Sequence, residues 1–313
     1  VRYHRMRGDN TIWMPGTGTL REPIAPELVA LTNIAGDGRT VAICVQMYVC
    51  VSAKTRTLRR AFDMPNWLLS HLPRGEILEA LEKAPGNEIA SGKLASAESS
   101  AALAVNAFGL FLERPDSLPA IPGTEAFGWP ATYVAIEKNC RFPWSGGHHP
   151  WLDAFVETQT HIIGVESKRY EPFRAKAVGR FSEAYWRDVW GVEMSGYQRV
   201  RDAVASDAAP FSRLDAAQLV KHALGLRTEA RRRGKCPALV CLHADPATWP
   251  DGTAIHPDHK QAHRGEISVF AEHVQSDEVA FRACRYAEVL DTWSRSNSPN
   301  VRHHAAAVKD AFL

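Results

Sequence analysis

The sequence has few cysteines and no long apolar run. Its six cysteines are scattered through 313 residues, without a CxxC pair or the dense spacing of a small secreted scaffold. The longest apolar stretch, residues 40–51, is interrupted by Gln46, and no apolar stretch follows the charged first residues. We therefore expect reduced thiols in a cytoplasmic protein, with neither a signal peptide nor a membrane span.

The signatures of several enzyme classes are also absent. The chain has no GxSxG motif, and no cysteine has a recognisable histidine partner in the sequence. Residues 15–19 lack the Lys-Ser/Thr of a phosphate-binding Walker loop. Four histidines lie between residues 243 and 263, but neither CxxC nor HExxH accompanies them, and residues 245–264 are predicted to form a loop. A zinc site there is therefore not our preferred interpretation.

The net charge of +2 is too small to indicate a nucleic-acid partner by itself. Basic residues do gather within residues 168–180 and 231–235, although either cluster alone is more typical of a solvated surface. With 45% hydrophobic residues the chain can bury a sizeable core. We expect residues 1–85 to form an N-terminal extension that packs on a main domain.

Periodicity and capping residues predict a mixture of helices and strands. A helix starting after Ser96 is stopped by Pro115, and a later helix is entered through the capping box Ser212-x-x-Asp215 and ends at Gly234. The predicted elements are a strand at 39–52, a helix at 66–83, a helix at 96–113, a β-hairpin at 152–168, a helix at 213–233, a strand at 239–242, and helices at 278–295 and 300–313.

The hairpin brings two acidic residues together. If it turns at residues 159–160, Asp153 lies opposite Glu166, and Lys168 joins them by the period of two. The other face is then an apolar layer made of Ala154, Val156, Ile163 and Val165. A turn shifted by one residue would pair Asp153 with Ser167, and the carboxylates would still converge. Glu157 is on the same face but farther from the strand end, where we expect a structural role.

Facing carboxylates repel one another unless a cation lies between them. Lys168 is on the wrong side of Glu166 to neutralise both, whereas Mg²⁺ or Mn²⁺ suits a small set of oxygen ligands completed by water and a phosphate. Such an ion activates a bound water and offsets negative charge on a phosphate, and Lys168 would position the water or offset the developing charge.

At these positions the chain resembles a known superfamily. Asp153-x12-Glu166-Ser167-Lys168 is similar to the signature of the PD-(D/E)xK, restriction-endonuclease-like nucleases, although Leu152 stands where the name has Pro. A bacterial group of restriction endonucleases in that superfamily is similar over about residues 85–245. The resemblance implies an α/β fold with a restriction-endonuclease-like core, in which a mixed central sheet has helices on its sides and a hairpin carries the active site. It also implies a nuclease domain at residues 86–313 that cleaves DNA with Mg²⁺ or Mn²⁺.

Further site residues follow from the resemblance and from helical spacing. By analogy with the superfamily, Glu88 is the first candidate for an additional acidic metal ligand and Glu98 the second, although either could equally be a surface acid. Gln218, Lys221 and His222 share one helix face at i, i+3 and i+4. This triplet could contact phosphate or a metal-bound water. A solvated face is the preferred interpretation for His222 and an equal alternative for Gln218.

A second function remains open at this point. The chain could be a catalytically inactive nucleic-acid-binding or scaffold protein that keeps the nuclease fold, although the retained Asp153, Glu166 and Lys168 favour an enzyme. A homodimer is plausible because cleavage of both strands of a duplex invites two active sites. The sequence leaves the type of nucleic acid and its sequence specificity undetermined.

Overall fold

The computed structural model describes residues 30–34, 40–44, 67–85, 89–175 and 179–313. The chain divides into two units, Val1–Phe62 and Asp63–Leu313. In the first, β1 (Ala30–Ile34) and β2 (Thr40–Cys44) form an antiparallel pair. The strand predicted at 39–52 is therefore observed over Thr40–Cys44, and residues 45–52 lie outside the described part of the chain.

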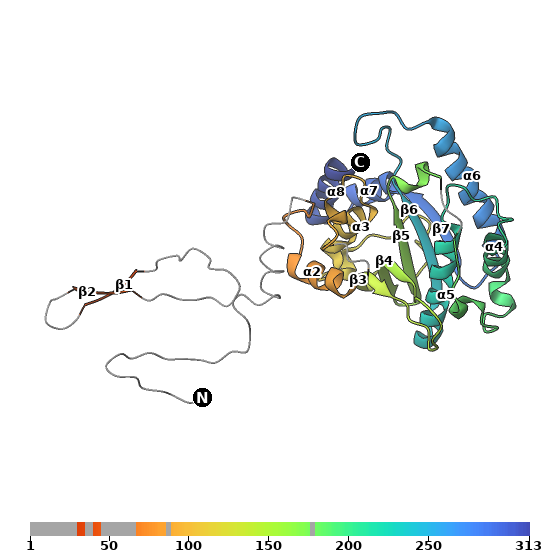
Figure 1. Cartoon of the computed structure of the whole chain (residues 1–313), viewed down its shortest axis with the longest axis horizontal. Helices are drawn as coiled ribbons and strands as arrows, with labels where there is room; N and C mark the ends of the chain where they lie inside the picture. The colour runs from red at the N-terminus through yellow and green to blue at the C-terminus, as the bar shows by residue number, and fades with distance from the viewer. Residues whose placement is uncertain (1–29, 35–39, 45–66, 86–88, 176–178) are drawn as a thin grey trace. The chain divides into compact units, whose positions relative to one another are not determined.

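A five-stranded mixed sheet is the centre of the second unit (Figure 1). Its strands lie in chain order, the first three antiparallel and the last three parallel. They are β3 (Ala131–Asn139), β4 (Trp151–Thr158), β5 (His161–Lys168), β6 (Cys236–His243) and β7 (Ala280–Arg285). This arrangement confirms the predicted mixed sheet.

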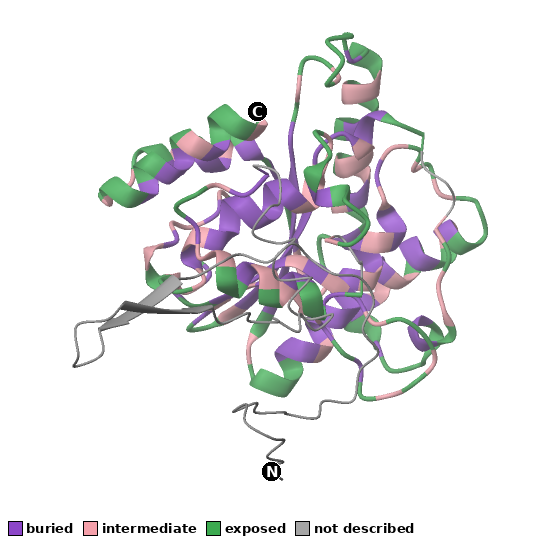
Figure 2. Cartoon of the chain, turned by 60° about the vertical axis from the view of Figure 1, so that its left-hand side comes forward, coloured by how far each residue is buried: buried purple, intermediate pink, exposed green. Residues whose placement is uncertain are grey.

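Helices cover both faces of the sheet, so that buried side chains form one layer on each side (Figures 1 and 2). One face packs against α2 (Arg74–Lys83), α3 (Ser100–Phe108), α7 (Tyr286–Ser294) and α8 (Pro299–Phe312). The other packs against α4 (Ser195–Ala205), α5 (Ala216–Arg233) and α6 (Pro257–Val274). Short 3₁₀ turns occupy Lys93–Ala95, Gly109–Phe111, Pro115–Ser117, Glu171–Phe173, Glu183–Trp186 and Val192–Met194.

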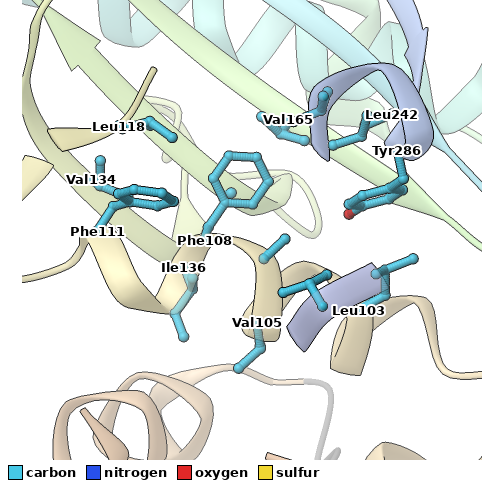
Figure 3. Packing of buried hydrophobic residues seen from close by; sticks show 14 of the residues in the cluster. Leu103, Val105, Phe108, Phe111, Leu118, Val134, Ile136, Val165, Leu242 and Tyr286 are labelled. Atoms are coloured by element: carbon cyan, nitrogen blue, oxygen red, sulfur yellow. The ribbon is translucent and has the colours of Figure 1, made fainter. Parts of the chain in front are cut away.

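The first of these layers is built around α3. Figure 3 shows Phe108 of α3 facing the sheet beside Val165 of β5, with Val134 of β3 close by. Asn106 of α3 is buried as well, and its side chain binds the backbone of Leu69 and Trp67 at 2.8 and 2.7 Å. Residues 67–84 therefore lie in the unit that contains the sheet. The sequence assigned them to the N-terminal extension, and a domain boundary at residue 85 stays a prediction.

The β4–β5 hairpin has the predicted register. Ala154 lies opposite Val165 and Val156 opposite Ile163, with the turn at residues 159–160. Gly164 lies in tight packing, because a Cβ there would lie 2.6 Å from a methyl carbon of Leu226 and 2.9 Å from one of Leu152, so these leucine side chains would have to shift.

Three predicted helices begin three to eight residues later than expected. The helix α2 begins at Arg74, since Pro73 cannot continue a helix begun earlier. The helix α3 is capped by Ser99, which accepts a hydrogen bond from Ala102, and not by Ser96. In α5 Asp215 itself is the N-cap, accepting from the backbone of Gln218. Its end at Gly234, in the left-handed conformation, is as predicted.

Two segments of the C-terminal third have a structure that differs from the prediction. The loop predicted at 245–264 is wrong from residue 257 on, because residues 257–274 form α6, with Pro257 in the first helical turn, where proline is favoured. Residues 280–285 form β7 and not a helix, because they complete the sheet beside β6. The predictions of a strand at 239–242 and of a terminal helix are confirmed by β6 and α8. In the described part of the chain, a helix with the length and apolarity of a membrane span is not found.

Candidate active site

The hairpin strands separate beside the predicted site. Their ladder ends at the pair Ala154–Val165, while β4 continues to Trp151 along β3 and β5 continues along β6. At the point of separation Asp153 Oδ2 accepts a hydrogen bond of 2.6 Å from the backbone N–H of Ser167. The carboxylate of Asp153 thus lies between two diverging strands, next to the end of β5 that carries Glu166 and Lys168.

Glu166, Lys168 and Gln218 meet on the side of the sheet that faces α5. Lys168 Nζ donates to Glu166 Oε1 and, over 2.8 Å, to Gln218 Oε1. Only 1% of the Glu166 side chain and 12% of the Lys168 side chain are exposed. Gln218 is in the first turn of α5, where the Asp215 cap fixes the backbone. The structure therefore brings together three of the residues that the sequence selected.

His222 belongs to the same cluster, which corrects the prediction of a solvated position. Its side chain is 3% exposed, and Nδ1 lies 3.0 Å from Glu166 Oε2. The face of α5 that carries Gln218 and His222 packs against the sheet, and the helix is covered on its other side by α4. The spacing of Gln218 and His222, one helical turn apart, was the signal in the sequence that both face one strand.

The pKa values show that Glu166 and Lys168 form a charged pair. Burial alone would raise the pKa of Glu166, but Lys168 and His222 outweigh it and lower the pKa from 4.5 to about 2. Burial alone would lower the pKa of Lys168, but the carboxylates of Glu166 and Asp153 raise it above its ordinary value. Lys168 is therefore an ammonium group that can donate hydrogen bonds and cannot act as a base.

Asp153 is the carboxylate that lacks a full counter-charge. Burial and the negative charge of Glu166 raise its pKa well above the ordinary value, and Lys168 and the Ser167 N–H offset this only in part. Two carboxylates beside one ammonium leave room for one more cation. Both candidate ligands supply hard oxygen atoms, which is the donor chemistry that Mg²⁺ and Mn²⁺ bind. Asp153 and Glu166 therefore fit a divalent ion that keeps water or substrate oxygens in its remaining positions.

Glu88 and Glu98 were the two acids expected as additional metal ligands, and the structure describes only the second of them. Glu88 lies outside the described residues. Glu98 is partly exposed, and its carboxylate forms an ion pair of 2.7 Å with Arg174. No group of three His, Cys, Asp or Glu side chains that could hold a metal ion occurs within the described ranges. The histidine-rich segment at 243–263 contains no such group either. Within it, the ring centroids of His243 and His263 lie 5.1 Å apart.

Glu137 is an acid near the site that the sequence did not reveal. The pairs Ile136–Ala154 and Lys138–Leu152 place it opposite Asp153, and its backbone has a φ of 47°. A residue other than glycine seldom adopts this left-handed conformation within a strand. Its negative charge contributes to the raised pKa of Asp153. Nothing in the local pattern of residues 131–139 signals this irregularity.

The opposite face of the site is held by hydroxyl groups. Ser167 Oγ is 2.7 Å from the hydroxyl of Tyr286 in α7 and donates to the backbone oxygen of Ser100 in α3 over 3.2 Å. Just after the strand, Glu171 accepts hydrogen bonds from the backbone N–H groups of Arg169 and Tyr170. These contacts fix the strand end that carries Glu166 and Lys168 on the side of the sheet that faces α3 and α7.

Comparison with known proteins gives a match to a protein family. A family model described as Restriction Endonuclease associating with ARP matches residues 52–306, a span that contains the whole hairpin and the α5 cluster. No curated protein and no solved structure matches the chain. Since the family model covers more than half of the sequence, the chain belongs to the family of restriction endonucleases described as associating with ARP.

Proposed function

We propose that this protein is a metal-dependent nuclease that hydrolyses phosphodiester bonds of DNA at Asp153, Glu166 and Lys168. The observation that carries the proposal is the buried ammonium of Lys168, held between Glu166 and Gln218 next to a second carboxylate that lacks a full counter-charge. An ion pair kept only for stability would not require a further acid beside it. Membership of a restriction-endonuclease family supports the same chemistry.

Each residue has a defined part in this proposal. Asp153 and Glu166 would hold a Mg²⁺ or Mn²⁺ ion, which when bound would lower the pKa of a bound water and neutralise phosphate charge. Lys168 donates a hydrogen bond to the attacking water or to a phosphate oxygen, and its raised pKa keeps the ammonium charged throughout. Gln218 Oε1 holds Nζ in place. Glu88 is the candidate for a further ligand. Hydrolysis forms one P–O bond to water and breaks the P–O bond to the departing nucleotide.

The test is cleavage of plasmid and single-stranded DNA with Mg²⁺ or Mn²⁺ by the parent, Asp153→Asn, Lys168→Ala and a control, Glu157→Gln. Glu157 is a matched control because it lies on the same strand but pairs with Lys235 and Arg233 at 2.7 and 2.6 Å. We expect cleavage by the parent and Glu157→Gln, and its loss in the other two. DNA binding without cleavage by every variant would instead support the inactive binding protein. Unchanged cleavage by Asp153→Asn would refute the site assignment.

A further inference from the structure

His222 contacts Glu166 on the oxygen that Lys168 does not use. Lys168 donates to Oε1, while His222 Nδ1 lies 3.0 Å from Oε2. The carboxylate is thereby held from two directions, by the strand that carries Glu166 itself and by α5. Gln218, one turn earlier on α5, holds the Lys168 ammonium in the same way.

Two buried polar atoms, Glu166 Oε2 and His222 Nδ1, face one another in this cluster. The two atoms lie 3.0 Å apart, but their geometry falls short of a hydrogen bond, and neither atom has a hydrogen-bond partner among the residues that the structure describes. A buried polar atom left without a partner costs stability, so buried groups in native proteins are almost always paired. A carboxylate oxygen only accepts, and therefore the hydrogen between these two atoms belongs on Nδ1 of His222.

We propose that His222 is a positioning residue, which donates from Nδ1 to Glu166 Oε2 and holds that carboxylate in the orientation that binds the divalent ion. This inference rests on the proposed function. Each carboxylate oxygen has two lone pairs, so Glu166 can accept from Lys168 and His222 and still bind a cation. Residues that hydrogen-bond to a metal ligand fix its orientation, and their loss weakens metal affinity by about 10- to 100-fold.

The experiment measures Mn²⁺ binding to the full chain by titration calorimetry without DNA. Asparagine at position 222 places an amide nitrogen where the imidazole has Nδ1, glutamine places it one bond farther along, and leucine has no donor. We expect His222→Asn to bind Mn²⁺ almost as tightly as the parent, and His222→Gln and His222→Leu to bind about 10- to 100-fold more weakly. His304→Gln is the control, since His304 is buried in α8 and contacts the backbone of Ala107.

The variants separate the possible outcomes. Parent-like affinity in His222→Leu, together with lost binding in Asp153→Asn, would overturn the inference and keep the proposed site. Parent-like affinity in Asp153→Asn would instead overturn the site itself. Circular dichroism verifies folding, and if the leucine variant does not fold, the asparagine and glutamine variants decide. Equal affinities in those two would show that a donor at the Nδ1 position is not what holds Glu166.

Discussion

Replacement of Lys168 by methionine should destabilise the protein even though the two side chains are similar in length. Methionine leaves the carboxylate of Glu166 buried without its ammonium partner, while Asp153 remains beside it. The pKa of Glu166 is lowered from 4.5 to about 2 in the folded protein. At about 1.4 kcal/mol for each tenfold change in proton affinity, this corresponds to about 3 kcal/mol.

An independent argument gives a similar magnitude. Removal of one partner from a buried ion pair costs about 3–5 kcal/mol, because the other charge stays buried without compensation. For a unit of this size a loss of about 3 kcal/mol corresponds to about 6 to 12 °C in melting temperature. A group whose pKa is lowered by folding stabilises the protein above its ordinary pKa, and this stability is lost as the pH falls through the folded value. The difference in the free energy of unfolding between the parent and Lys168→Met should therefore be full at pH 7 and should become smaller below pH 4.5.

Urea unfolding at pH 7, followed by circular dichroism, measures the free energy of unfolding of both proteins. Lys83→Met is the control, because Lys83 pairs with Glu79 on the exposed side of α2 with more than half of each side chain accessible. Such a pair contributes at most about 0.5 kcal/mol. If Lys168→Met unfolds at the same urea concentration as Lys83→Met, the ammonium of Lys168 does not compensate the buried negative charge of Glu166.

Other parts of the fold give three further predictions. Burial lowers the pKa of His304 from 6.5 to about 4. As the pH falls through this range, His304 is protonated in the unfolded chain but not in the folded protein, so the protein should lose about 3 kcal/mol of stability between pH 6.5 and pH 4. His304→Gln removes this titration, and urea unfolding across that pH range would contradict the reasoning if the variant lost as much stability as the parent. Gly164→Ala should lower the free energy of unfolding by about 1–3 kcal/mol, since its Cβ displaces Leu226, and a neutral effect would mean that α5 adjusts freely. Asp215→Ala should cost about 1 kcal/mol in the same measurement through loss of the α5 cap, and an unchanged midpoint would exclude a capping role.

Local pattern was sufficient for the hairpin and for the C-terminal end of α5. With the two-residue turn at 159–160, Ala154 and Val165 share the buried face, and this register places Asp153 near Glu166. The end of α5 at Gly234 follows from the chain's need for a left-handed residue there. These features depend on neighbours that are close in the sequence, and for this reason the sequence by itself determined them.

Only the tertiary structure decided the remaining features. Residues 280–285 have helical propensity but become a strand because β6 offers an unpaired edge, and this edge is formed by residues about forty positions earlier. The burial of His222 depends on which face of α5 meets the sheet, and α4 covers the face that would otherwise have met solvent. Local periodicity contains no information about which of two layers covers a helix. The sequence therefore selected the two carboxylates and the lysine, while the packing of α5 added the histidine beside them.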